Sequence, residues 1–320
     1  MQALVLTEES FGIATVDDPL ALPGQTRIRV VAAALNKRDQ WIREGKYAKI
    51  VYPAILGSDV CGRTIADDRV IVDPSFDWGD AEAAQGEHYH ILGMPTQGTI
   101  AQVVCVPTTN VHPAPNHLSD VQAAALPLAG ITAYRALMVR GGVTPTDTVV
   151  ITGIGGGVAT MVLQMALAVG ARVFVTSGSD AKIEQALALG ATGGVNYHRD
   201  SWMKELSAMA GPVDLAIDSA GGRVMNDLTA VMRPGGRIVF YGATLGPTPL
   251  LNLHRIFWKQ LTIMGSTMGS PGDFAAMLAF VRRHQIVPVV DSEVPFHDAV
   301  RAFDLLATSD QFGKIVITMP

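Results

Sequence analysis

The chain has 320 residues, of which 48% are hydrophobic and 17% are charged, and it carries a formal net charge of −5. This composition favours a globular protein with a large core over a disordered one, and the length suggests about two domains of roughly 150 residues each. No Lys/Arg-rich stripe is present, so the charge pattern indicates neither a nucleic acid nor an anionic membrane as a partner.

The longest apolar stretch, residues 158–169, is interrupted by Gln164 and closed by Gly170. It is shorter than the about 20 residues that cross a bilayer, so it predicts a buried helix. The N-terminus lacks a basic start followed by an apolar core, and we therefore expect no secretory signal. Because Cys61 and Cys105 are the only cysteines, we expect a cytoplasmic protein, with a single bridge between them as the alternative.

The first 120 residues have the pattern of short strands separated by turns. Residues 27–34 and 98–106 are rich in β-forming side chains, and residues 65–72 carry strand-like apolar residues around a charged turn. The segment 74–97 is polar and contains several glycines and a proline, which predicts a long loop.

From about residue 148 the pattern changes to alternating strands and helices. We predict strands at 148–152, 171–176, 194–197, 213–218 and 237–241, and helices at 158–169, 180–189, 201–210 and 223–232. Residues 234–236, Pro-Gly-Gly, are expected to separate the last helix from the last strand. Such alternation predicts right-handed βαβ units around a parallel sheet, with one more strand, 261–266, at the edge of the sheet.

A glycine-rich loop follows the predicted strand 148–152. Its residues are Gly153, Ile154, Gly155, Gly156 and Gly157, followed by Val158 and Ala159. Glycine allows a sharp turn and a close approach of the backbone to a pyrophosphate, and the helix N-terminus then offers free N–H groups. A strand before the loop and an apolar helix after it are the context in which this motif binds a dinucleotide. A glycine-rich turn without a ligand is the alternative.

The end of the second strand distinguishes between the two nicotinamide cofactors. An NAD site usually has an acidic residue about 20 residues after the glycine loop, whereas this chain has Thr176, Ser177, Gly178 and Ser179 there. Hydroxyl groups followed by Lys182 suit the 2′-phosphate of NADPH, although Lys182 could also be an ordinary solvated residue. The one acid nearby, Asp180, is predicted to cap the following helix.

At this point the sequence resembles the medium-chain dehydrogenase/reductase superfamily, and in particular its zinc-free quinone oxidoreductase-like branch. The resemblance covers essentially the whole chain. It rests on AAALNKRD (32–39), GSDVCG (57–62), DRVIV (68–72), LPLAGITAYRAL (126–137), the glycine loop, the TSGS turn (176–179), LGA (189–191), PGGRIVFYG (234–242) and FGKIVI (312–317).

The resemblance implies an α/β fold with two domains. A Rossmann domain, which is a doubly wound parallel sheet, would span residues 121–258. A GroES-like, mainly-β catalytic domain would combine residues 1–120 and 259–320. The resemblance places Ser177, Lys182 and Tyr197 near the adenosine phosphate and Thr132 near the nicotinamide. The complete set of predicted cofactor-binding residues is Thr132, Gly153, Gly155, Gly156, Gly157, Val158, Ser177, Gly178, Ser179, Lys182, Tyr197, Ser219, Tyr241 and Gly242.

The sequence departs from the zinc-dependent members of this superfamily. Those members have a Cys in the segment matching 35–39 and a His-Glu pair after the glycine matching Gly57, whereas this chain has Asn36 and then Ser58-Asp59. A zinc site needs three or four N, S or carboxylate donors. We therefore expect no metal.

Without a metal, hydrogen-bond or proton donors must stabilise the charge that hydride transfer creates on a carbonyl oxygen. Asn36 stands at the position of the first missing zinc ligand and would orient the substrate or a water. Tyr47 resembles in its spacing a tyrosine of the family's quinone and 2-enoyl reductases and would donate a proton to an enolate or hydrogen-bond a quinone oxygen. The alternatives are that Asn36 closes a turn and that Tyr47 is an amphipathic wall residue.

These observations predict an NADPH-dependent, zinc-independent reductase of a quinone or an α,β-unsaturated carbonyl, because conjugation delocalises the incoming charge. The alternatives are an NADP-linked alcohol or ketone dehydrogenase and a non-catalytic NADPH-binding redox sensor. We expect a small-molecule substrate and no nucleic-acid or membrane partner. We also expect a homodimer joined at the apolar edge strand 261–266, because an unprotected edge invites pairing.

Overall fold

The computed structural model describes all 320 residues, which divide into two compact units. Unit 1 comprises Met1–Ile131 and Gly269–Pro320, and unit 2 comprises Thr132–Met268. Both boundaries lie about ten residues later than the predicted 120/121 and 258/259. The first boundary is later because the backbone N–H of Leu128 donates to the buried carboxylate of Asp59, which ties this segment to unit 1.

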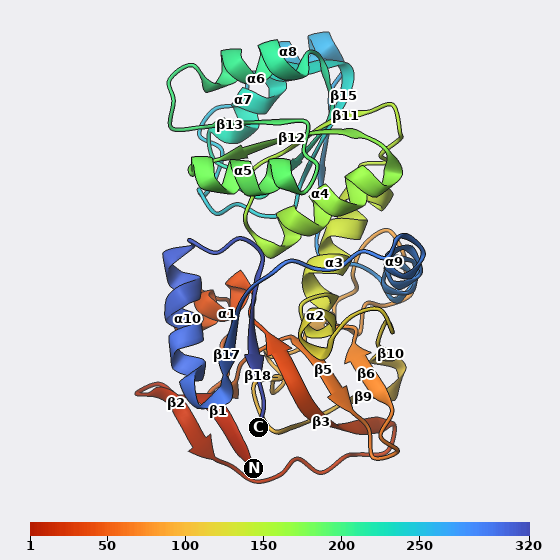
Figure 1. The fold of residues 1–320 in the computed structure, drawn as a ribbon, viewed down its shortest axis with the longest axis vertical. Helices are drawn as coiled ribbons and strands as arrows, with labels where there is room; N and C mark the ends of the chain where they lie inside the picture. Colours follow the sequence, from red (N-terminus) through yellow and green to blue (C-terminus); the bar gives the residue numbers. More distant parts are fainter. The chain divides into compact units, whose positions relative to one another are not determined.

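Unit 1 is mainly β. Its large sheet has the order β10-β6-β5-β3-β18-β17, with β9 also paired to β3, and a small sheet has the order β2-β1-β4. The strands are β1 (Gln2–Leu6), β2 (Phe11–Thr15), β3 (Gln25–Ala34), β4 (Ala54–Ile55), β5 (Asp59–Arg63), β6 (Arg69–Val72), β9 (Val103–Pro107), β10 (Val111–Pro113), β17 (Val290–Pro295) and β18 (Lys314–Thr318). The C-terminal β18 pairs antiparallel with β3, so the two chain ends share one sheet (Figure 1).

The helices of unit 1 are short apart from two near the C-terminus. They are α1 (Lys37–Arg43), α2 (Asp120–Ala124), α9 (Pro271–His284) and α10 (Ala299–Thr308), and α3 (Pro127–Tyr134) crosses the unit boundary. Phe303 of α10 and Ile317 of β18 are fully buried in the core of this unit, together with Leu4, Ile28 and Leu56. The strongly amphipathic α10 therefore covers the sheet with its apolar side.

Two predictions for unit 1 need correction in detail. The strand predicted at 98–106 begins only at Val103. The reason is that the N–H groups of Gly98, Thr99 and Ile100 bond to carbonyls of residues 55–57 instead of extending the ladder. The segment 74–97 is mostly loop, as predicted, but it contains a two-residue ladder between β7 (Ser75–Phe76) and β8 (His90–Ile91).

Unit 2 contains a six-stranded sheet in which every pairing is parallel, with the order β13-β12-β11-β14-β15-β16. The strands are β11 (Thr148–Ile151), β12 (Arg172–Ser177), β13 (Gly193–Asn196), β14 (Val213–Asp218), β15 (Met232–Phe240) and β16 (Thr262–Gly265). Written by chain order this is 3-2-1-4-5-6, the arrangement of a doubly wound Rossmann sheet. The predicted fold class is confirmed, and β16 is the edge strand as expected.

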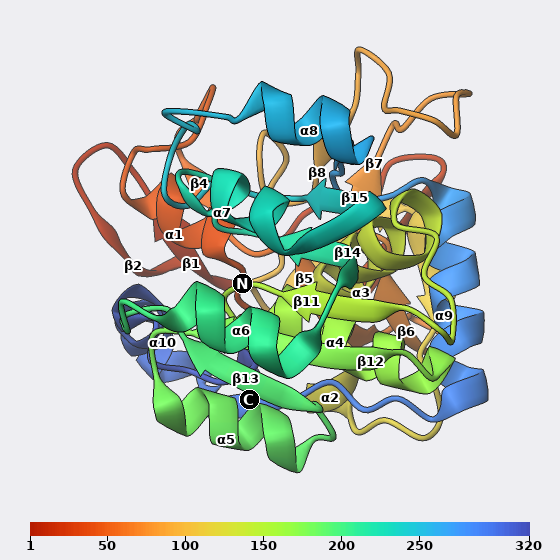
Figure 2. The same cartoon turned by 90° about the horizontal axis from the view of Figure 1, so that it is seen from above.

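Five α-helices and one π-helix belong to unit 2, and Figure 2 labels the five α-helices around the sheet. They are a π-helix at Arg135–Arg140, α4 (Gly157–Val169), α5 (Asp180–Ala188), α6 (Trp202–Ala210), α7 (Val224–Val231) and α8 (Leu253–Lys259). The apolar stretch 158–169 is the buried helix α4, which ends at Gly170 with φ of 97°. Nowhere in the protein is a helix both long and apolar enough to span a bilayer.

The expected break at residues 234–236 does not end the pairing of β15. Met232 pairs with Val213, and the regular register resumes between Arg237 and Leu215 after an irregularity. The Pro-Gly-Gly segment is accommodated by this irregularity, with Gly235 at a φ of 73°.

Candidate cofactor and substrate sites

The glycine loop connects β11 to α4 in unit 2. Gly153 and Gly155 have φ values of 63° and 120°, in the region that favours glycine, and Gly156 is the N-cap of α4. A Cβ placed on Gly156 would meet no heavy atom within 4 Å. The first turn of α4 lies at Gly157 and Val158 and has no side-chain cap. The loop therefore offers open space beside unpaired helix N–H groups, which fits a pyrophosphate.

The ends of the neighbouring strands meet this loop. A Cβ on Gly153 would lie 3.3 Å from Ser219 Oγ, and a Cβ on Gly242 would lie 2.9 Å from the Ser219 carbonyl oxygen. Gly153, Ser219 and Gly242 follow β11, β14 and β15, so the structure brings these three predicted residues together. This is the carboxyl edge of the sheet beside the point where the strand order reverses, where ligands of such folds bind.

Two polar residues that the sequence analysis missed support this edge. Asp218 is fully buried and accepts hydrogen bonds from Thr152 Oγ1 at 2.5 Å and from the N–H groups of Ala220 and Gly221 at 3.2 and 2.8 Å. Burial raises the pKa of Asp218, and the three donors oppose that shift. The signal in the sequence was an acid directly after the apolar run Leu215–Ile217, at the end of a strand.

The two remaining predicted residues of this group are Tyr241 and Thr132. Burial raises the pKa of the Tyr241 phenol above its usual range, opposed by a hydrogen bond with Ser219. Tyr241 therefore lies with the three residues at the sheet edge. Thr132 is buried, and its hydroxyl lies 3.6 Å from Met268 Sδ.

The turn after β12 carries the hydroxyl residues predicted to face an adenosine phosphate. Ser177 is buried, and its Oγ lies 3.5 Å from the Ile154 carbonyl oxygen and accepts from the Ser179 N–H at 3.2 Å. Ser179 is the N-cap of α5 and accepts from the Lys182 N–H at 3.4 Å. The prediction that Asp180 caps this helix is wrong, because Asp180 is already inside the first turn.

Tyr197 lies across this turn, together with two basic residues that the sequence analysis did not identify. A Cβ on Gly178 would come within 2.8 Å of Tyr197 Oη and 2.7 Å of His198 Nε2. Arg199 donates to Asp180 at 3.1 Å and so neutralises the one acid near the turn. The available signal was the His-Arg pair directly after β13. Together these groups make the turn polar, and Arg199 also lies 3.6 Å from the Glu205 carboxylate.

In unit 1, Asn36 belongs to a buried cluster with Asp59 and Lys314. Asn36 Nδ2 donates to Asp59 Oδ2 at 2.9 Å, and Lys314 Nζ donates to Asn36 Oδ1 at 2.5 Å and to Asp59 Oδ2 at 2.9 Å. The three residues are 8%, 0% and 4% exposed. Both atoms of the Asn36 amide are thus bonded within the protein.

Asn36 is also the N-cap of α1, where its N–H donates to Asp39 Oδ2 at 2.8 Å. Asp39 is fully buried and also accepts from the Gly57 N–H at 3.3 Å. Burial raises the pKa of Asp39, and the charges of Arg38 and Lys314 oppose that shift. These bonds favour a role for Asn36 in holding α1 against β5 and β18.

A zinc ion does not fit this cluster. The residues at the family's ligand positions supply an amide, a hydroxyl and one carboxylate, and the protein contains no group of three or more His, Cys, Asp or Glu placed to hold a metal. The ammonium of Lys314 already occupies the bonding positions of Asn36 and Asp59. Its positive charge would repel a divalent cation.

Tyr47 follows α1 and lies against Arg38. The Arg38 Cζ atom is 5.0 Å from the centre of the Tyr47 ring, and Arg38 Nε donates to Tyr47 Oη at 3.4 Å. Tyr47 is partly buried at the margin of the unit 1 core. Its ring is therefore held by stacking and its oxygen by a charged donor.

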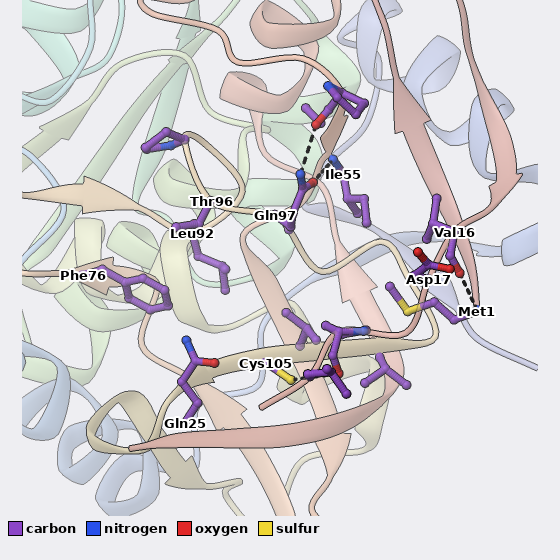
Figure 3. A pocket seen from close by; sticks show the side chains of 18 of the residues that line it. Met1, Val16, Asp17, Gln25, Ile55, Phe76, Leu92, Thr96, Gln97 and Cys105 are labelled. Carbon is purple, nitrogen blue, oxygen red and sulfur yellow. Dashed lines mark hydrogen bonds between the residues drawn. The ribbon is translucent and has the colours of Figure 1, made fainter. Parts of the chain in front are cut away.

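Unit 1 also contains a hollow of about 690 Å³, which Figure 3 shows from close by. Its lining includes Met1, Val16, Phe76, Gln97 and Cys105. The Gln97 amide is used inside the protein, since its Oε1 accepts from the Ile55 N–H at 2.6 Å and its Nε2 donates to the Pro53 carbonyl at 3.0 Å. Neither Asn36 nor Tyr47 lines this hollow. Cys61 and Cys105 are both free thiols.

Comparisons with known proteins agree with the two folds. Residues 22–116 match the family model described as an alcohol dehydrogenase GroES-like domain, and residues 157–283 match the one described as a zinc-binding dehydrogenase. The chain is 34% identical to "Zinc-type alcohol dehydrogenase-like protein YogA" of Leptosphaeria maculans, over 94% of this chain and 92% of that protein. It is 28% identical to an acryloyl-coenzyme A reductase of Sulfurisphaera tokodaii, over 99% of each chain.

Among solved structures, one titled "Crystal Structure of NAD-dependent alcohol dehydrogenase" superposes with a TM-score of 0.94 and 34% identity over the whole of both chains. The strand order, the glycine loop and these matches lead to one conclusion. The chain belongs to the medium-chain dehydrogenase/reductase superfamily, with a GroES-like domain and a Rossmann domain.

Proposed function

We propose that this protein is an NADPH-dependent reductase of α,β-unsaturated carbonyl compounds or quinones that works without a metal. The observation that carries the proposal is the Lys314 ammonium bonded to Asn36 and Asp59. An alcohol dehydrogenase of this family uses a metal to stabilise an alkoxide, and this cluster does not fit one. A conjugated acceptor needs less support, because the incoming charge spreads over several atoms. The similarity to an acryloyl-coenzyme A reductase supports the same acceptor class.

The choice of NADPH rests on the turn after β12. Bound NADPH would supply a hydride to the acceptor. Its 2′-phosphate would be held by the hydroxyls of Ser177 and Ser179 and by the positive charges of Lys182 and Arg199, with Tyr197 beside them. Since Arg199 pairs with Asp180, no unpaired carboxylate at this turn opposes the phosphate.

For the chemistry in unit 1 we propose Tyr47 as the proton donor. Its phenol can give a proton to the enolate or the hydroquinone anion that hydride transfer creates. We assign Asn36 to positioning, because its amide already bonds to Asp59 and Lys314.

The test is NADPH oxidation, followed at 340 nm in the presence of EDTA, with NADH as control. The acceptors are 9,10-phenanthrenequinone, 2-cyclohexen-1-one, crotonyl-coenzyme A and a simple aldehyde. We expect turnover of at least one conjugated acceptor with NADPH and none of the aldehyde. Tyr47→Phe should lower kcat roughly 100-fold. Tyr52→Phe, at a partly exposed tyrosine nearby, should leave kcat unchanged. Turnover that EDTA abolishes would contradict the proposal.

Cofactor preference has its own test. Arg199→Ala should raise KM for NADPH about tenfold and leave KM for NADH unchanged, since one charge-assisted bond is worth about that much. Arg172, at the opposite end of β12, provides the control. An equal effect of Arg199→Ala on both cofactors would remove the argument for NADPH.

An NADP-linked alcohol or ketone dehydrogenase is the second candidate, because two of the similar proteins are described as alcohol dehydrogenases or as alcohol dehydrogenase-like. Reversible turnover of simple alcohols with NADP would identify it. Tight NADPH binding without turnover of any acceptor, and without sensitivity to Tyr47→Phe, would identify a redox sensor.

We also propose a homodimer joined at β16, whose outer edge is unpaired within the chain. Sedimentation at micromolar concentration tests this. A monomeric mass would contradict it.

A further inference from the structure

Arg38 is a buried arginine whose hydrogen bonds all go to neutral acceptors. The residue is 7% exposed. Its Nη1 donates to Ser58 Oγ at 2.6 Å and to the Leu92 carbonyl at 2.9 Å, and its Nε donates to Tyr47 Oη at 3.4 Å. No carboxylate takes any of these bonds. The positive charge of the guanidinium also acts on the buried carboxyl of Asp39, and it favours negative charge forming beside it.

One donor of this guanidinium is unused. Arg38 Nη2 is buried and has no hydrogen-bond partner. A buried donor without a partner is unusual in a native fold and calls for an explanation. The bonds through Nη1 to Ser58 and Leu92 fix the plane of the group. Nη2 is therefore a donor whose position is fixed and whose bonding capacity is unused.

Among the three acceptors of this guanidinium, the phenol of Tyr47 is the one that can release a proton at an accessible pH. Tyr47 Oη accepts from Arg38 Nε, and the ring stacks on the guanidinium. Because this oxygen already accepts one bond, its own proton remains available for donation to another group. If that proton leaves, the phenolate lies beside a fixed positive charge, and charge-assisted bonds are the stronger ones.

The phenol of Tyr89 lies close enough to Arg38 to be compared with that of Tyr47. Tyr89 Oη and Ser75 Oγ are also buried. Burial raises the pKa of Tyr89 above its usual range, Asp73 adds to that shift, and Ser75 and Arg38 oppose it. Tyr89 therefore stays neutral. Of the two phenols, Tyr47 is the one that accepts a bond from the guanidinium.

We propose that Arg38 is a positioning residue that prepares Tyr47 for proton transfer and stabilises the phenolate left behind. This inference rests on the proposed function. Once the conjugated acceptor has taken a hydride, its enolate takes the Tyr47 proton. The O–H bond of Tyr47 breaks, a C–H or O–H bond forms on the product, and Arg38 holds the phenolate. A proton from water then restores the phenol, so one hydride and one proton are consumed in each turnover.

The first test measures phenolate character directly and needs no turnover. Tetranitromethane nitrates tyrosine through its phenolate, and peptide mass spectrometry gives the ratio of nitrated Tyr47 to nitrated Tyr52 in the same protein. We expect this ratio to fall roughly tenfold in Arg38→Gln, the loss expected for one charge-assisted bond. Arg43→Gln is the matched control, because Arg43 lies on the same helix, stacks on Phe11 and pairs with Asp304. A ratio that is unchanged or higher in Arg38→Gln would overturn the proposal.

The second test uses the acceptor that the wild type reduces. Arg38→Ala should lower kcat roughly 100-fold with little change in KM for NADPH, and added guanidinium chloride at millimolar concentration should restore part of the loss. The double variant Arg38→Ala/Tyr47→Phe should be no slower than Tyr47→Phe alone. Additive losses, or a folded Arg38→Ala protein with normal kcat, would overturn the proposal. A wild type that reduces no conjugated acceptor defeats the proposed function, whereas the nitration ratio still decides the role of Arg38.

Discussion

The candidate sites of the two units consist of different kinds of chemical groups. In unit 2 the site at the sheet edge consists of glycines, hydroxyls and backbone N–H groups, and its buried acid, Asp218, accepts three hydrogen bonds. In unit 1 the site is a set of buried charged side chains, among them Asp59 and Lys314. Small groups leave room for a large ligand, whereas buried charges fix a framework and create an electrostatic field. The difference is consistent with the proposal that unit 2 receives the cofactor and unit 1 polarises the acceptor.

The largest expected effect is on the framework of unit 1. Lys314→Met would leave the Asp59 carboxylate and the Asn36 amide oxygen buried without their cationic partner. Removing one partner of a buried ion pair costs about 3–5 kcal/mol, and we expect a loss of this size in urea unfolding. Lys46→Met is the control, because Lys46 pairs with Glu44 at 2.8 Å but is 70% exposed, and it should cost less than about 1 kcal/mol. Equal losses of stability in the two variants would show that the buried ion pair contributes no more than the exposed one.

A smaller effect concerns Asp73, a buried acid of unit 1 whose carboxylate accepts a hydrogen bond from the Ser75 N–H at 3.0 Å. Burial raises the pKa of Asp73 to about 8, with Asp273 adding to the shift. Between the unfolded value near 4 and this value the folded state binds more protons than the unfolded state. Stability therefore falls as the pH rises from about 4 to about 8.

Asp73→Asn keeps an acceptor for the Ser75 N–H and removes the charge. We expect this variant to match the wild type near pH 4 and to be more stable by a few kcal/mol near pH 8. Urea unfolding at pH 4.5, 6 and 8 measures the difference. A difference that does not vary with pH would show that Asp73 titrates normally.

The smallest expected effect on stability is in unit 2. Gly156→Ala places a methyl group where no heavy atom lies within 4 Å and where φ is −73°. Stability should change by less than about 0.5 kcal/mol, while NADPH affinity, measured by fluorescence titration, should fall roughly tenfold. Gly12→Ala on β2, also with nothing within 4 Å, is the control and should leave affinity unchanged. Unchanged affinity in Gly156→Ala would mean that the pyrophosphate lies elsewhere.

The same contrast explains how much could be predicted from the sequence. The sheet of unit 2 and its glycine loop were predictable because each strand, turn and helix is specified by neighbouring residues. His198 and Arg199 were missed because their approach to Gly178 and Asp180 depends on β13 lying beside β12.

In unit 1, Asn36 and Tyr47 could be singled out only through the resemblance, and their partners could not be found at all. Asn36 and Lys314 are 278 positions apart, and no local pattern links residues at that separation. The contact of Arg38 with Tyr47 spans only nine positions. It too was missed, because an arginine on a short amphipathic helix is usually solvated.

The pairing of β3 with β18 also sets an order for assembly during synthesis. All six strands of unit 2 have left the ribosome once residue 265 has emerged, and they can pair while translation continues. Unit 1 must wait for residue 314, so Asp59 spends this interval without its ammonium partner. The N-terminal segment of unit 1 is therefore translated first, yet its sheet is completed last.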